Sequence, residues 1–96
     1  MTALEKHTLG VISTAHISEK TAQLMDKDQL PFTVWKSDYG YFMHVWVPYN
    51  QHPSGVYDKM PDDLKTVMTY VWSKGARYLL LDRDGEKHKE LPIYDW

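Results

Sequence analysis

The sequence predicts an α+β domain with the element order β-α-β-β-α-β. Two segments carry apolar residues at helical spacing, and four shorter runs are rich in β-branched or aromatic residues. This order usually packs as a two-layer sandwich of the ferredoxin-like (split βαβ) kind, a mostly antiparallel sheet with two helices on one face. At 96 residues the chain is expected to form one domain, residues 1–96, with residues 86–96 as a C-terminal extension.

The first strand is expected at residues 8–15 and the first helix from Ser18 to about Asp28. Ser18 suits the N-cap because its hydroxyl accepts a backbone N–H of the first turn. Pro31 cannot continue a helix, so the helix ends before it. One buried face follows from helical spacing and comprises Ile17, Thr21, Leu24 and Met25.

Two strands, residues 32–37 and 39–47, are expected next, with a turn between them. Side chains of the second strand alternate between two faces, Tyr41, Met43, Val45 and Val47 on one and Phe42, His44 and Trp46 on the other. Neither face is polar, so this strand is expected inside the sheet. Residues 49–60 are expected to form a long loop after Pro48.

The second helix is expected to begin at Pro61, with Asp62 and Asp63 complementing the helix dipole. Gly75 is placed to close this helix in the left-handed conformation. A last strand over residues 77–82, buried on both faces, and a tight turn at 82–85 follow. The apolar stripe of the helix comprises Leu64, Val67, Met68, Val71 and Trp72.

Composition excludes several classes of protein. The chain has no cysteine, so disulfide frameworks and thiolate metal sites are excluded. A formal net charge of −2 argues against strong polyanion binding. No apolar stretch is long enough to span a bilayer, and the first ten residues lack the apolar core of a secretory signal. We therefore expect a cytoplasmic protein that does not insert into membranes.

Aromatic residues are the most informative feature, because they make up 14% of the chain and gather between Phe32 and Tyr57. A two-layer sandwich leaves one sheet face open, and Phe42, His44 and Trp46 are the set expected there. Exposed rings of this kind are typical anchors of protein interfaces. An alternative is that the C-terminal extension folds back as a lid, with Tyr94 and Trp96 covering the rings; the lid is the favoured role for this extension.

The predicted function is therefore a non-enzymatic protein-binding factor. Its partner-binding residues are expected to be Phe42, His44, Trp46, Tyr49, Tyr57, Asp58, Asp62 and Asp63, the acidic groups meeting a basic channel on the target. A single-stranded nucleic-acid-binding domain that stacks bases on the aromatic strand is the alternative. Tyr39 stands where that motif has a basic residue, and Met43 where it has a ring, which makes nucleic acid a poor partner.

No constellation of residues predicts catalysis, a cofactor or a metal. The five histidines form no paired ligand motif, and no glycine-rich cradle or activated nucleophile is present. The turn that begins at Asp82 echoes a calcium loop, but Leu91 stands where the bidentate carboxylate is required. We expect no enzyme activity.

Four motifs resemble a family of small uncharacterised proteins of bacterial plasmids and prophages: Ser13–Ser18 (STAHIS), Tyr39–Phe42 (YGYF), Leu81–Gly85 (LDRDG) and the closing Leu91–Trp96 (LPIYDW). The resemblance implies an accessory factor of a mobile element, of the anti-CRISPR or anti-restriction type. Its partner would be a host defence nuclease complex, blocked by surface occupation.

Edge pairing through residues 32–37, where Lys36 is the main protection, also allows a homodimer.

Overall fold

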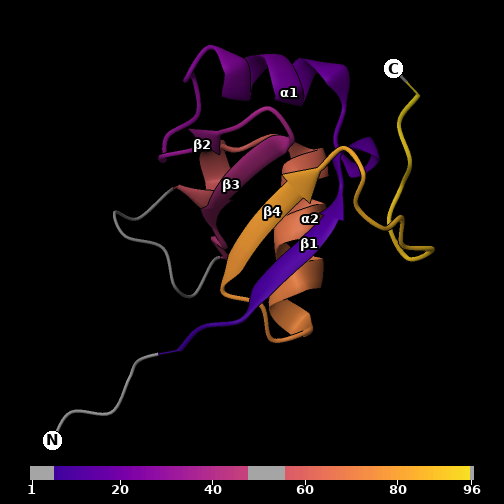
Figure 1. Cartoon of the computed structure of the whole chain (residues 1–96). Helices are drawn as coiled ribbons and strands as arrows, with labels where there is room; N and C mark the ends of the chain where they lie inside the picture. Colours follow the sequence, from indigo (N-terminus) through magenta and orange to yellow (C-terminus); the bar gives the residue numbers. More distant parts are fainter. Residues whose placement is uncertain (1–5, 48–55, 96) are drawn as a thin grey trace, which may run out of the picture.

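The computed structural model describes residues 6–47 and 56–95 and confirms an α+β fold with a four-stranded mixed sheet and two helices (Figure 1). The strands are β1 (Leu9–Ser13), β2 (Trp35–Lys36), β3 (Gly40–His44) and β4 (Tyr78–Asp82). The helices are α1 (Glu19–Asp26) and α2 (Asp62–Ser73), with the 3₁₀ turns η1 (Thr14–His16) and η2 (Tyr57–Lys59). No helix of the described ranges is both long and apolar enough to cross a membrane.

The strand order, β1-β4-β3-β2, corrects the predicted topology. A split βαβ unit places one strand between the two parallel strands that a helix joins. Here β4 lies directly beside β1 in parallel, and β3 pairs antiparallel with both β4 and β2. The ferredoxin-like arrangement is therefore wrong, although two of the three strand pairs are antiparallel as expected. The prediction failed because strand order depends on non-local pairing, which side-chain periodicity does not report.

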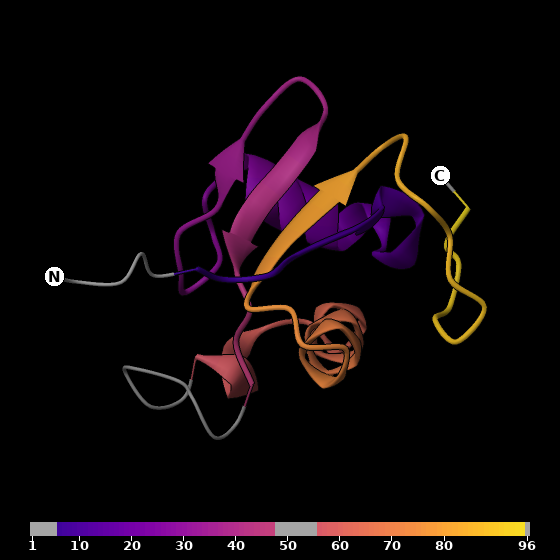
Figure 2. The same cartoon turned by 60° about the horizontal axis from the view of Figure 1, so that its bottom comes forward.

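Both helices contribute to the one core on the same side of the sheet (Figures 1 and 2). The strands supply Ile12, Met43, Leu79 and Leu81 to this core. The helices supply Ala22, Met25, Leu64, Val67, Met68 and Val71. Of the predicted face of the first helix, Ile17, Thr21 and Met25 are buried but Leu24 is not part of the core; the predicted stripe of the second helix is confirmed except for Trp72, which is only partly buried. The sheet is thus covered by helices on one face.

Helix ends follow local side-chain chemistry. The Ser18 hydroxyl accepts the Thr21 backbone N–H at 3.3 Å, so Ser18 caps α1 as predicted. Pro61 is the residue before α2 rather than its first residue, and Gly75 closes that helix with φ +93°. The turn after β4 is confirmed by the Gly85 N–H, which donates to the Asp82 carbonyl at 2.9 Å.

The strands are shorter than predicted. The Ser13 hydroxyl accepts the Ala15 N–H at 3.0 Å and starts η1, which ends β1 at Ser13. The strand predicted at residues 32–37 reduces to β2, and that predicted at 39–47 reduces to β3. In β4 only Leu79 and Leu81 are fully buried, so the expected burial on both faces is wrong. Of the predicted long loop, residues 49–55 lie outside the described residues.

Candidate functional site

The sheet face opposite the helices carries a patch of side chains, here called the open face. Its seven members, none of them charged, are Leu9, Val11, Trp35, Phe42, His44, Tyr78 and Leu80. The register aligns them in two rows across the strands. Leu80 lies between Val11 and Phe42 in one row. Tyr78 lies between Leu9 and His44 in the other.

The rings of the open face contact one another. Phe42 and Tyr78 stack with centroids 5.7 Å apart and planes 11° from parallel. His44 lies 4.7 Å from Tyr78, and Trp35 lies 5.6 Å from Phe42 and 5.9 Å from His44. Such contacts restrict the motion of each ring, so less side-chain conformational entropy is lost when a partner binds.

The open face is accessible. Trp35 is 49% exposed, Leu9 and Val11 are each 44% exposed, and His44 is also exposed. Figure 1 looks onto this face with α2 behind the sheet, and no described segment crosses in front of β1, β4 and β3. The structure therefore presents large apolar groups to solvent at a place where the chain's own helices do not cover them.

The C-terminal extension lies elsewhere, and the lid interpretation is wrong. The Tyr94 N–H donates to the Ala15 carbonyl at 2.8 Å, and the His88 N–H donates to His16 Nε2 at 2.9 Å. Leu91 is buried in the core. The extension is thus fixed beside η1 at the end of β1, as Figure 1 shows in yellow. Trp96, the second ring expected in the lid, lies outside the described residues.

Trp46 forms the rim of the open face rather than an exposed anchor. It is half-buried, packs against the core and lies 6.2 Å from Phe32 and 6.3 Å from His44. Its Nε1 is buried with no hydrogen-bond partner among the described residues. Beside it, a hollow of about 400 Å³ is also lined by Arg77, whose Cζ lies 3.6 Å from the Trp72 ring centroid.

The other predicted contact residues do not join the open face. Tyr57 and Asp58 lie on η2 and Asp62 begins α2, in the helical layer. Asp63 links the two helices, because its carboxylate accepts the Ser18 N–H at 2.7 Å and the Thr21 hydroxyl at 2.8 Å. These four residues belong to a surface different from that of Phe42 and His44.

Tyr49 lies outside the described residues, so its place is not assigned. Sequence reasoning chose Phe42 and His44 but not their neighbours Trp35 and Tyr78 on β2 and β4. The alternation of Leu9 and Val11 was visible in the sequence. Their position beside Tyr78 and Leu80 depends on the parallel β1–β4 pair, which was not predicted.

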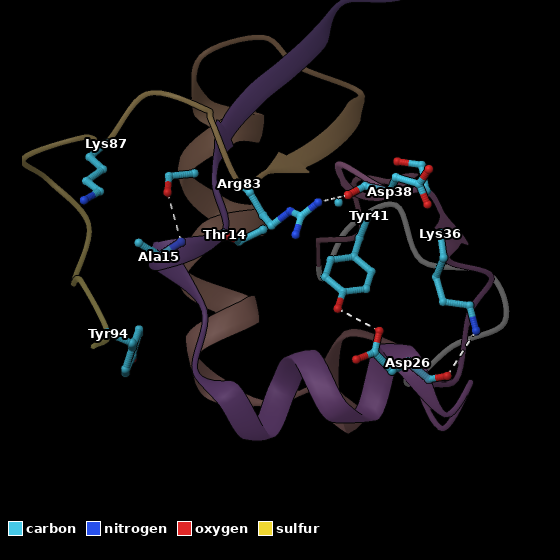
Figure 3. Close-up of a pocket in the computed structure, with 12 residues that line it drawn as sticks. Thr14, Ala15, Asp26, Lys36, Asp38, Tyr41, Arg83, Lys87 and Tyr94 are labelled. Atoms are coloured by element: carbon cyan, nitrogen blue, oxygen red, sulfur yellow. Dashed lines mark hydrogen bonds between the residues drawn. The ribbon is translucent and has the colours of Figure 1, made fainter. Parts of the chain in front are cut away.

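A second candidate is a polar pocket of about 520 Å³ at the carboxyl ends of β1 and β4 (Figure 3). Crevices at such strand ends bind ligands in many α/β proteins. Here the polar groups bind one another: the Tyr41 hydroxyl donates to Asp26 Oδ1 at 2.8 Å, and Arg83 donates to the Asp38 carbonyl. Burial, with the Asp26 hydrogen bond, raises the pKa of Tyr41 to about 12.

Several polar groups of the pocket, those of Tyr41, Asp26 and Arg83, are therefore already engaged within the protein. Among the described residues, no group of three or more histidine or acidic side chains is arranged to hold a metal ion. The open face is the stronger candidate because it combines exposure, size and fixed geometry.

Comparison with known proteins gives one match. A family model described as the C-terminal domain of a family of unknown function, DUF5983, matches residues 9–96. Neither the curated proteins nor the solved structures contain a match. The match includes β1 and every later element of the fold.

Proposed function

Since the chain belongs to the DUF5983 C-terminal domain family, whose function is unknown, we propose that it is a non-enzymatic protein-binding domain. Its partner docks on the open face, with Trp35, Phe42 and His44 as central anchors. The observation that carries this proposal is a patch of seven side chains, without lysine, arginine or an acidic residue, on the sheet face that the helices leave open. Monomeric proteins rarely expose large contiguous apolar patches unless something binds there.

The composition of the patch favours a protein partner. Aromatic residues are enriched in the buried centres of protein interfaces, and charged residues are depleted there. The open face has this composition. The Phe42 ring lies between those of Trp35 and Tyr78, with centroids 5.6 Å and 5.7 Å away. Polar groups at its border, such as Asp82 beside Leu80 on β4, match the polar rim of such interfaces.

Single-stranded nucleic acid is the second candidate, because stacked rings such as Phe42 and Tyr78 are also base-stacking platforms. Phosphate binding, however, requires lysine or arginine beside the rings. None of the seven open-face positions is lysine or arginine, and Arg77 lies in the neighbouring hollow, over Trp72. Binding of a labelled oligonucleotide at low salt that weakens steeply with added salt would favour this candidate over a protein partner.

A narrower form of the proposal names the biological setting. The resemblance of the closing LPIYDW motif to small plasmid and prophage proteins supports a cytoplasmic accessory factor of a mobile element. Such a factor would occupy a surface of a host defence nuclease complex and inhibit it. Expression of the chain in a strain with active defence should then raise the transformation efficiency of a targeted plasmid, and the double variant Trp35→Ala/Phe42→Ala should abolish the gain.

Site-specific photo-cross-linking tests the docking surface itself. A benzophenone amino acid placed at position 35 should cross-link a partner in bacterial lysate. The same group at position 93 is the matched control, because Ile93 is 59% exposed and lies on the C-terminal extension. Equal cross-linking from both positions, or none from position 35, would contradict the proposal.

A further inference from the structure

Strand β1 is an edge of the sheet. It pairs with β4 on one side and has no neighbouring strand on the other within the described residues. Figure 1 shows this outer edge uncovered along most of the strand. An edge strand presents unpaired N–H and C=O groups that can pair with another strand.

Alternation identifies which main-chain groups point outward. The Thr8 carbonyl accepts hydrogen bonds from the N–H groups of Arg77 and Tyr78, so the main-chain groups of Thr8 point toward β4. The Ser13 N–H donates to the Glu86 carbonyl, outside the β1–β4 ladder, at 3.0 Å. Successive residues of a strand direct their N–H and C=O groups to opposite sides. The main-chain groups of Leu9 and Val11 point outward, as those of Ser13 do. The N–H and C=O groups of Leu9 and Val11 are here called the free window of this edge.

This window lacks the usual protection against pairing. The segment from Leu9 to Ser13 contains no charged residue and no proline. The opposite edge differs, because β2 has only two residues and its Lys36 bonds the Asp28 carboxylate at 3.1 Å. Pairing through residues 32–37 is thus less favourable than the sequence indicated, and β1 is the better pairing edge.

We propose that two copies of this chain pair antiparallel through β1, with the two-fold axis at Gly10. In this register Leu9 of each copy lies opposite Val11 of the other, and each such pair exchanges two hydrogen bonds. Side chains opposite each other share a face, so Leu9 and Val11, each 44% exposed, cover one another across the axis. The result is a continuous sheet of eight strands, four from each copy.

A second copy matches this window better than an arbitrary extended segment. The window ends at Ser13 because the Glu86 carbonyl occupies the next outward N–H. An identical strand has a window of the same length, so every outward group of both windows finds a partner. The dimer covers Leu9 and Val11 of the open face but leaves its rings uncovered on one side of the joined sheet. Docking on Trp35, Phe42 and His44 and pairing through β1 can therefore be tested separately.

Sedimentation velocity on the full chain tests the dimer. Strand pairing alone buries a small interface, so we expect a monomer–dimer equilibrium between about 5 and 500 μM. Val11→Pro removes an outward N–H without breaking the β1–β4 ladder, and should weaken dimerisation at least tenfold. Val11→Lys, which places two like charges near the axis, should do the same and serves if the proline variant does not fold. Trp35→Ala should leave the equilibrium unchanged.

Amide hydrogen exchange gives the second measurement. The amides of Leu9 and Val11 should become protected as the protein concentration rises. A monomer throughout the concentration range would overturn the proposal. So would a dimer that survives both Val11 variants, or one that Trp35→Ala dissociates. Protection of the two amides only after another protein is added would assign the edge to a foreign strand and overturn self-pairing.

Discussion

His16 holds the C-terminal extension against the domain, and its replacement should release that extension. The ring is 1% exposed and contacts two main-chain groups of the extension. Nδ1 lies 2.8 Å from the Pro92 carbonyl, which can only accept, and Nε2 accepts the His88 N–H at 2.9 Å. These partners require the neutral ring with its proton on Nδ1.

The expected cost follows from these contacts. Each hydrogen bond contributes about 1 kcal/mol net, and removal of one partner adds a penalty for the group left behind. His16→Ala also leaves a cavity, so we expect a loss of about 2–4 kcal/mol in the free energy of unfolding. For a chain of this size that corresponds to a fall in Tm of about 10–25 °C.

Two conservative variants separate the two contacts. In His16→Asn the amide nitrogen takes the place of Nδ1 and can still donate to Pro92. In His16→Gln the amide oxygen takes the place of Nε2 and can still accept from His88. Urea denaturation should rank both between wild type and His16→Ala, and limited proteolysis should cut the extension first in His16→Ala. An unchanged free energy of unfolding in His16→Ala, with the extension equally resistant, would refute this reasoning.

Three further outcomes are expected. Asp63→Ala should cost about 2–4 kcal/mol in urea denaturation, because two hydrogen bonds from α1 lose their acceptor, whereas exposed Asp62→Ala should cost about 0.5 kcal/mol or less. Gly40→Ala should cost about 3 kcal/mol or more by the same assay, since φ is +159° and the added Cβ would lie 1.8 Å from the Leu81 carbonyl oxygen. Folding favours neutral Tyr41, because its pKa is raised to about 12 in the folded protein. Its contribution to the free energy of unfolding is therefore complete below about pH 10 and is lost between about pH 10 and 12. Tyr41→Phe should lack this loss, and alkaline denaturation curves that run parallel for the two proteins would contradict it.

The helices could be predicted from sequence because their determinants are local. Ser18 caps α1 from within its own first turn, and the stripe from Leu64 to Val71 on α2 follows helical periodicity. The two faces of β3 were also predicted, since Met43 is buried while His44 is exposed. Each of these features involves residues a few positions apart.

The sheet order and the position of the extension could not be predicted in the same way. The parallel β1–β4 pair joins the two ends of the domain, and the His16 contacts with Pro92 and His88 span a similar separation. No pattern near His16 specifies those partners. The open face was consequently predicted from one strand, because its other members join it through the pairing of β3 with β2 and β4 and of β4 with β1.

The central claim is that the open face binds a partner protein. Its most direct test is to identify that partner by cross-linking, purify it, and compare its Kd for wild type with its Kd for Trp35→Ala. A fully buried tryptophan covers about 150–250 Å², and 49% of Trp35 is still exposed. Truncation to alanine therefore removes about 100 Å² of the area that a partner would bury. At about 25 cal/mol per Å² this corresponds to about 2.5 kcal/mol, or close to a hundredfold increase in Kd. An increase of this size, with Ile93→Ala unchanged, is the expected result. Equal Kd values for wild type and Trp35→Ala would contradict the claim.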